Sequence, residues 1–234
     1  MLSVADIILE HPFMYRALHT ITGLRKLHAR LISDVLRRYD DPTKLRVLDL
    51  GCGPGDTLNL IGDNAGYTGI DVNAKYVAMA SRKSPRTASF LVGDVTKLDP
   101  AQFQEFDLII AFGLIHHLGD TDADALLSAA SRMLKPTGCV ISLDGCRRDG
   151  TSPVVRWILD HDRGRHIRKE HEYLTMFSRY LHIETIFTDS SVMHIPYSIL
   201  SIVGRPECRQ PVETRPSTLA DVSDRMTMTA TMRE

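Results

Sequence analysis

The chain has 234 residues, of which 43% are apolar and 24% charged, and this usage excludes a disordered chain and fits one globular domain. The formal net charge is -1, so the chain has no overall basic field that would attract nucleic acid. The apolar run "LIIAFGLI" (108–115) is far shorter than the roughly 20 residues that span a bilayer, which indicates no membrane segment.

The start of the chain and the cysteine pattern indicate a compartment. "MLSVADIILEHP" has neither a charged start nor a small-residue cleavage site, so we expect no signal peptide. Cys52, Cys139, Cys146 and Cys208 form no Cys-x-x-Cys pair, which argues against a zinc site or a disulfide framework. We therefore expect a cytoplasmic protein without a bound metal.

Short apolar strands alternate with helical periods over the first two thirds of the chain. Apolar residues three and four positions apart predict an amphipathic helix within 23–39, and a second one within 122–136 that Pro136 ends. This alternation predicts a doubly wound α/β fold, in which helices cover both faces of a parallel sheet. The expected strands are 46–50, 67–71, 88–94, 106–113 and 139–145.

The chain changes character after Gly145. Residues 146–180 are charged and more helical than strand-like, and an insertion between late strands of an α/β sheet is a natural cover for a substrate. Two more strands are expected at 182–190 and 197–205. The predicted organisation is one domain over 1–206 with an N-terminal helical cap at 1–44, followed by a polar, flexible tail at 207–234.

A glycine turn, "GCGPGD" (51–56), follows the first expected strand. The dinucleotide fingerprint is Gly-x-Gly-x-x-Gly, and here the third glycine comes one residue early. Asp56 would repel a pyrophosphate at the following helix N-terminus, and no Gly-Lys-Ser or Gly-Lys-Thr follows as in a P-loop. The turn therefore favours a ligand that lies over the glycines without a phosphate.

Five segments in this order carry a family resemblance: "VLDLGCGPGD", "GIDVNAKYV", "VGDV", "FDLIIAFGLIHHL" and "RMLKPTGCVISLDG". Together, over 47–145, they resemble the class I S-adenosylmethionine-dependent methyltransferases. "HPFMY", "DRGRHIR" and "IPYSIL" are similar to a bacterial branch of small-molecule methyltransferases. The resemblance implies a Rossmann-like sheet of seven strands, the last antiparallel near 198–205, and S-adenosylmethionine as the cofactor.

The resemblance also implies roles for individual residues. Asp49 would receive the ammonium group of the methionine part, Asp71 the ribose hydroxyls, and Asp94 the adenine amine. A purely structural alternative for each acid is that it caps the helix that follows. Cys52 is expected to pack as a small apolar group. The implied cofactor-binding residues are Tyr15, Asp49, Gly51, Cys52, Gly53, Asp71, Val72, Asp94, Val95, Ala111 and Phe112.

The expected chemistry is in-line transfer of a methyl group from a sulfonium, for which the enzyme mainly supplies alignment and excludes water. A base is needed where the acceptor is a hydroxyl. His116 and His117 come just after the fourth expected strand, and we favour His117 slightly as that base. The alternative is that the pair is structural or only shapes the pocket.

The cover segment is rich in arginine, and guanidinium groups bind carboxylates and phosphates. An anionic acceptor bound by Arg163 and Arg168 is one interpretation, and a solvated helical face explains the same charges equally well. Tyr197 is a further candidate for the acceptor pocket.

The predicted function is S-adenosylmethionine-dependent methylation of a small molecule, with O-methylation favoured. A non-catalytic sensor or scaffold that binds the cofactor is one alternative. A nicotinamide-dependent oxidoreductase is another, and the displaced third glycine disfavours it. A nucleic-acid methyltransferase is disfavoured by the neutral charge balance and by "AFGL" in place of an Asn-Pro-Pro-Tyr-like segment.

Overall fold

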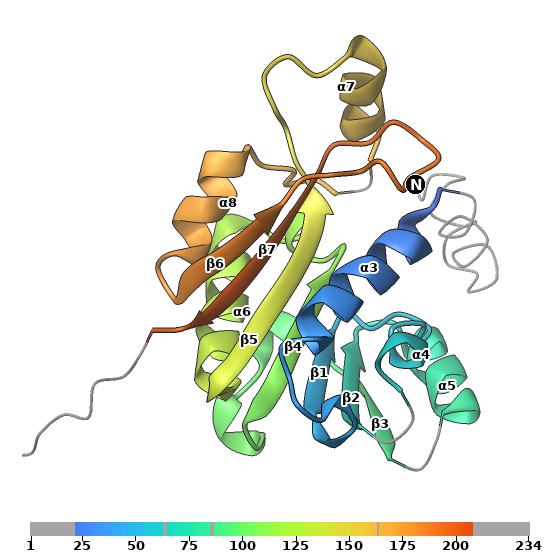
Figure 1. Cartoon of the computed structure of the whole chain (residues 1–234), viewed down its shortest axis with the longest axis vertical. Helices are drawn as coiled ribbons and strands as arrows, with labels where there is room; N and C mark the ends of the chain where they lie inside the picture. The colour runs from blue at the N-terminus through green and yellow to red at the C-terminus, as the bar shows by residue number, and fades with distance from the viewer. Residues whose placement is uncertain (1–21, 63–64, 85–86, 163, 208–234) are drawn as a thin grey trace, which may run out of the picture.

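A single seven-stranded sheet forms the centre of the protein, as expected (Figure 1). The computed structural model describes residues 22–62, 65–84, 87–162 and 164–207. The strand order is β3-β2-β1-β4-β5-β7-β6, and β7 runs antiparallel to both of its neighbours. The strands are β1 (Arg46–Leu50), β2 (Gly66–Asp71), β3 (Ala88–Val92), β4 (Phe106–Phe112), β5 (Leu134–Gly145), β6 (Leu181–Phe187) and β7 (Ile199–Pro206).

Helices connect the parallel strands. The α-helices are α3 (Leu24–Leu36), α4 (Leu58–Ile61), α5 (Ala74–Lys83), α6 (Asp120–Met133), α7 (Pro153–Asp160) and α8 (Glu170–Phe177). Four short 3-10 helices occur in the described chain: η1 (Pro42–Lys44), η2 (Val95–Lys97), η3 (Pro100–Gln102) and η4 (Ile115–His117). None of the described helices is both long and apolar enough to cross a membrane.

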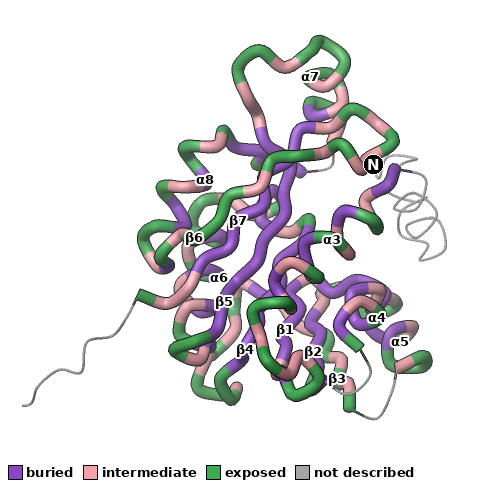
Figure 2. Tube along the Cα trace, viewed as in Figure 1, coloured by how far each residue is buried: buried purple, intermediate pink, exposed green. Residues whose placement is uncertain are grey.

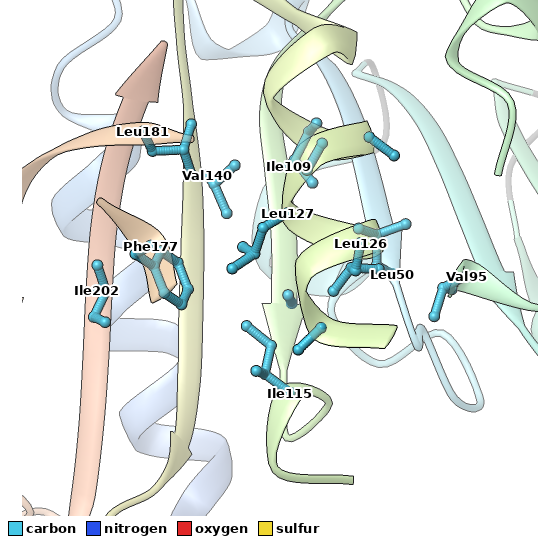
Figure 3. Close-up of a cluster of buried hydrophobic side chains, with 14 of the residues drawn as sticks. Leu50, Val95, Ile109, Ile115, Leu126, Leu127, Val140, Phe177, Leu181 and Ile202 are labelled. Carbon is cyan, nitrogen blue, oxygen red and sulfur yellow. The ribbon is translucent and has the colours of Figure 1, made fainter. Parts of the chain in front are cut away.

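The central strands of the sheet are buried on both faces, because their alternate residues enter two separate apolar clusters. Ile109 of β4 packs with α6 and α8, and Figure 3 shows Leu126, Leu127 and Phe177 pointing toward the strands from these helices. Ile110 of the same strand packs on the other face, with α3 and α4. Figure 2 shows the result, buried strands between partly exposed helices.

Some expected boundaries were wrong. The helix expected to extend to Pro136 ends at Met133, and β5 begins at Leu134 because that residue already pairs with Phe106 of β4. A register shift in this pairing accommodates the early start of the strand. β4 ends one residue early because Gly113 turns the chain with a φ of 63°. β3 ends at Val92, before Asp94 caps η2.

The order of the sheet reverses between β1 and β4, and ligands of open α/β sheets bind outside the carboxyl ends of the strands at such a point. α7 and α8 follow β5, so the 146–180 insertion begins at this same edge. Figure 1 shows α7 standing away from the sheet, and Figure 2 shows it largely exposed. The fold thus places the glycine turn after β1 and the histidine pair after β4 at one sheet edge.

Candidate functional site

The glycine turn is a tight backbone cradle between β1 and α4. Gly51, Gly53 and Gly55 have φ angles of 70°, 54° and 78°, which side chains with a Cβ rarely adopt. A Cβ on Gly55 would lie 2.9 Å from the Ala80 Cβ, so the turn also needs glycine for its packing on α5. The amides of Gly51 and Cys52 donate to the Ile70 carbonyl at 2.8 and 3.0 Å. The turn is therefore fixed to the end of β2.

Asp71 connects the end of β2 to this turn. Its Oδ2 accepts from the Gly53 amide at 2.8 Å, and its Oδ1 accepts from the Asn73 amide at 2.7 Å. A carboxylate has about four acceptor sites, so each oxygen retains one for a ligand hydroxyl. Asn73, and not Asp71, caps α5, so the simple capping alternative does not account for Asp71.

Asp49 lies on β1 beneath the turn and is 2% exposed. Its Oδ2 accepts a hydrogen bond from the buried Tyr67 hydroxyl. Burial raises the pKa of the Asp49 carboxyl to about 7, although hydrogen bonds from Tyr67 and Thr57 oppose the shift. The contacts described for Asp49 are hydroxyls and no cationic side chain, so an ammonium group of a ligand would supply the missing charge.

Asp94 differs from the other two acids. Its Oδ1 accepts from the Thr96 amide and hydroxyl at 3.0 and 2.7 Å, and its Oδ2 lies 2.9 Å from Lys97 Nζ. The hydrogen bonds from Lys97 and Thr96 lower the pKa of Asp94 to about 2. Capping of η2 explains the Thr96 contacts and a local ion pair explains the Lys97 contact, so the adenine role of Asp94 stays a prediction. Val95 beside it is buried in the core.

Other predicted cofactor residues divide between surface and core. Val72 is 77% exposed, an unusual position for a valine, and lies directly after Asp71. Cys52 is buried, and burial raises its thiol pKa, which supports the expected packing role. Ala111 and Phe112 are buried at the end of β4, where the Phe112 ring lies 4.6 Å from the His28 ring of α3. Tyr15 lies outside the described residues.

The histidine pair lies in η4, just after β4, and its two members differ in environment. His117 is exposed, and its ring centroid is 4.2 Å from that of the buried His116. The Nδ1 of His116 lies 2.8 Å from Asp144 Oδ1 near the end of β5, and the Nε2 lies 3.7 Å from Asp162 Oδ1. The same Asp144 oxygen accepts from the His116 amide at 3.1 Å. Asp144 thus holds both the backbone and the ring of His116.

The two carboxylates determine the charge of His116. Burial opposes the imidazolium, but the Asp144 hydrogen bond and the charges of Asp144 and Asp162 outweigh it and raise the His116 pKa. Arg168 opposes the charge only weakly, as the last of these influences. The imidazole therefore gains a proton more readily than an ordinary histidine near neutral pH.

Arg168 of the cover segment is buried, with 7% exposure, and binds the η4 loop instead of facing solvent. Its Nε and one terminal nitrogen donate to Asp120 Oδ1 at 3.0 and 2.7 Å. The remaining donors reach the carbonyls of Ile115, Leu118 and His166 at 3.2, 2.7 and 3.1 Å. These contacts occupy all the N–H groups of a guanidinium. The geometry supports a structural role for Arg168 in place of the predicted contact with an anionic acceptor.

Tyr197 belongs to the same region, because its hydroxyl donates to Asp162 Oδ2 at 2.7 Å. The Gly164 amide donates to the other oxygen of Asp162, also at 2.7 Å. A Cβ on Gly164 would lie 1.9 Å from His116 Cδ2, so this glycine permits the cover to rest on the imidazole. Arg163 lies outside the described residues.

Sequence reasoning missed Asp144, Asp162 and Gly164. Asp144 had a usable signal, since it is another acid near the carboxyl end of a parallel strand. Asp162 is one charge among many in the cover segment, and Gly164 matters through a contact with His116, 48 residues away in the sequence. Neither carries a local pattern that would single it out.

These residues fit S-adenosylmethionine. The glycine turn leaves room for close approach of a ligand to the backbone. Asp49 provides a buried acid without a cationic partner among the described residues, and Asp71 retains acceptor capacity for a ribose. Val72 provides exposed apolar surface next to Asp71, against which a flat base can pack.

Comparison with known proteins also indicates a methyltransferase. A model of the methyltransferase domain matches residues 47–138. A ubiquinone biosynthesis O-methyltransferase from Rhodopseudomonas palustris is 32% identical over 136 residues, which are 52% of this chain and 50% of that protein. One from a Bradyrhizobium species is 27% identical over 171 residues, 64% of this chain and 63% of that protein. The chain spans about half the length of most of these relatives.

Solved structures share the fold. A TehB-like SAM-dependent methyltransferase from Corynebacterium glutamicum has a TM-score of 0.58 at 22% identity, covering 82% of this chain and 94% of that one. Magnesium protoporphyrin IX methyltransferase from Synechocystis, with bound SAH, has a TM-score of 0.61 at 21% identity, covering 78% and 84%. The [4+2]-cyclase SpnF has a TM-score of 0.60 at 20% identity, covering 76% and 81%. Since this fold also occurs in a protein named as a cyclase, the reaction must be argued from the site.

Proposed function

Because this chain belongs to the class I S-adenosylmethionine-dependent methyltransferases, we propose that it transfers a methyl group to the hydroxyl of a small molecule. One observation carries the proposal. The glycine turn with Asp49 and Asp71 lies at the same sheet edge as the histidine pair that follows β4. The cradle suits the cofactor, and the imidazoles suit an acceptor that must lose a proton.

S-adenosylmethionine, when bound, supplies a methyl group that is already activated by its sulfonium. The chain's own residues then bind and align. Asp71 holds the glycine turn to β2 and accepts from the ribose, while Asp49 pairs with the ammonium group. Alignment of the methyl carbon with the acceptor oxygen, in a site that excludes water, supplies most of the rate enhancement that such a reaction needs.

The acceptor oxygen is the finer part of the proposal. A hydroxyl must lose its proton as its oxygen forms the new bond, and one of His116 and His117 takes it. The names of the ubiquinone biosynthesis relatives support an O-methyl product. An anionic acceptor has less support, because Arg168 is fully engaged within the protein.

Calorimetric titration of the purified protein with S-adenosylmethionine, S-adenosylhomocysteine and NAD tests the cofactor. We expect both sulfur compounds to bind and NAD not to bind. Asp71→Ala should weaken binding at least about tenfold, because it removes the acceptor of the Gly53 amide and also the proposed hydrogen bond to the ribose. Asp99→Ala is the matched control, since the exposed Asp99 also accepts a backbone amide two residues ahead but caps only η3. Binding of NAD alone would refute the proposal and favour an oxidoreductase.

A radiolabelled methyl donor with a panel of phenols, alcohols and amines tests the reaction. Transfer to hydroxyl compounds supports O-methylation, and transfer only to amines would replace it with N-methylation. Tight cofactor binding with no transfer to any member of the panel would favour the sensor or scaffold alternative.

A further inference from the structure

Tyr67 and Asp49 share one face of the sheet. Tyr67 of β2 pairs in register with Val47 of β1, two residues before Asp49, and residues two apart on a strand line the same face. Gly69 pairs directly with Asp49 and contributes no side chain there, and the Tyr67 hydroxyl supplies the hydrogen bond to the carboxyl instead. The contact therefore runs diagonally between two paired strands, which hold both ends of it.

The acceptor of the Tyr67 hydroxyl is unusual for a buried tyrosine. A main-chain carbonyl is enough to satisfy such a hydroxyl, as Tyr173 shows by donating to the Gly145 carbonyl at 3.0 Å. Tyr67, which is 1% exposed, donates to the 2% exposed Asp49 instead. Burial of an acid costs free energy that a purely structural contact does not require. The cost is understandable if the carboxylate serves a ligand and Tyr67 serves the carboxylate.

The groups described around Asp49 are neutral or acidic. Tyr67 and Thr57 donate hydrogen bonds that favour the carboxylate, whereas burial opposes it. Other titratable groups that act on Asp49 or Tyr67 are the acids Asp71 and Asp56 and the buried thiol of Cys52. None of these groups carries a positive charge. The ionised form of Asp49 consequently depends on the two hydroxyls until a ligand brings a cation.

The carboxyl retains room for that cation. A carboxylate has about four acceptor sites, and the hydroxyls of Tyr67 and Thr57 use two of them. We infer that Tyr67 is a positioning residue for S-adenosylmethionine, because its hydroxyl fixes the Asp49 carboxyl and favours the ionised form that pairs with the ammonium group of the cofactor. The inference rests on the proposed function. Tyr67 is buried below the turn and acts only through Asp49.

Calorimetric titration of the full-length protein with S-adenosylhomocysteine at pH 6.5 and 8.5 tests the hydroxyl. Tyr67→Phe keeps the ring and removes only the hydroxyl, so the Asp49 carboxylate becomes harder to form. We expect binding about tenfold weaker than in wild type at pH 6.5, and within about threefold of wild type at pH 8.5. The ratio of the two affinities at each pH cancels any titration of the ligand's own amine. Equal affinities at pH 6.5, or a loss of the same size at both pH values, would overturn the inference.

Two further variants separate this role from a general loss of packing. Tyr39→Phe is the matched control, because it also loses a tyrosine hydrogen bond, to the Asp107 carbonyl near the start of β4 and away from the glycine turn. Its affinity should equal that of wild type at both pH values. In an Asp49→Asn background, Tyr67→Phe should change the affinity less than about twofold, because the hydroxyl acts through the carboxylate. An undiminished effect in that background would contradict the inference.

Carbon NMR of ligand-free protein labelled at aspartate and tyrosine measures the link between the two side chains without any cofactor. The Asp49 carboxyl should titrate at higher pH in Tyr67→Phe than in wild type, and at the wild-type pH in Tyr39→Phe. In wild type, the Tyr67 resonance should shift at the midpoint of the Asp49 titration, which decides the link even if Tyr67→Phe does not fold. If wild type binds neither S-adenosylmethionine nor S-adenosylhomocysteine, the proposed function fails and the inference falls with it. Wild-type binding without the NMR link overturns the inference alone.

Discussion

The Tyr67 hydroxyl of β2 donates a hydrogen bond to Asp49 Oδ2 of β1, and both side chains lie inside the sheet beneath the glycine turn. The pair satisfies the carboxyl with a neutral donor and provides no positive charge. Burial raises the pKa of Asp49 to about 7 despite the Tyr67 hydrogen bond, so the carboxyl is close to half protonated near neutral pH. Under the proposed role of Asp49, cofactor binding and protein stability should depend on pH in the same range.

Affinity for S-adenosylmethionine should rise with pH and level off above about pH 7. Below that pH, Asp49 must lose a proton before it pairs with the ammonium group, so binding releases up to one proton and the affinity changes up to about tenfold per pH unit. Titration calorimetry in buffers of different ionisation enthalpy measures both quantities. Asp49→Asn should bind weakly and without this pH dependence. Binding of equal affinity at pH 5.5 and 7.5 in the wild type would contradict the role of Asp49.

The stability of the ligand-free protein should contain an opposite contribution from Asp49. The pKa is raised from 3.8 in the unfolded chain to about 7 in the folded protein, so the stabilising contribution is complete below pH 3.8 and is lost as pH rises through 7. Between pH 4 and 7.5, Asp49→Asn should gain up to about 4 kcal/mol in free energy of unfolding relative to wild type. Urea denaturation at several pH values measures the difference.

Asp94→Asn is the control for this measurement. The Asp94 pKa is lowered to about 2, so its contribution is present above the unfolded value of 3.8 and is lost as pH falls toward 2. Between pH 4 and 7.5 it should therefore change far less than the contribution of Asp49, and in the opposite direction. Wild-type and Asp49→Asn curves that run parallel across this range would show that Asp49 is already ionised in the folded protein.

Arg168→Met should destabilise the protein by about 3 kcal/mol, because it removes the buried guanidinium that donates to the carbonyls of Ile115, Leu118 and His166. Arg179→Met is the matched control. Arg179 also pairs with an aspartate of α6, Asp124, but is half exposed, so its loss should cost at most about 1 kcal/mol. Thermal unfolding compares the two. A stable Arg168→Met variant with weakened acceptor binding would restore the substrate-binding role predicted from the sequence.

Gly164→Ala should move the His116 ring or the cover, because the new methyl would lie 1.9 Å from the imidazole Cδ2. We expect a loss of about 1–3 kcal/mol and a shifted His116 resonance, with cofactor affinity unchanged. Gly119→Ala provides the control, since its Cβ would meet His166 at an ordinary 3.8 Å. If Gly164→Ala leaves the His116 resonance in place, the cover does not rest on the imidazole in solution.

The sequence by itself determined the sheet and the place of the glycine turn with its two acids. Apolar runs and helical periods repeat locally, so all seven strands were located. Several of their ends were wrong, for example where pairing extended β5 to Leu134, where Gly113 ended β4, and where β6 ended at Phe187 instead of residue 190. The glycine turn follows β1 directly, Asp49 lies near the end of β1, and Asp71 is the last residue of β2. Since parallel strands align their carboxyl ends, these residues had to meet.

Only the tertiary structure decided which residues the cover segment and the histidines contact. Arg168 looked like a surface charge available to a substrate, but folding places it under the loop that it binds, 48 residues from its partner Asp120. His116 and His117 are neighbours in sequence and equivalent in type, and the contact with Asp144, 28 residues away, distinguishes them. The packing of strands and insertions decides which histidine is buried and which acid contacts it. The local hydrophobic pattern of the sequence does not encode that packing.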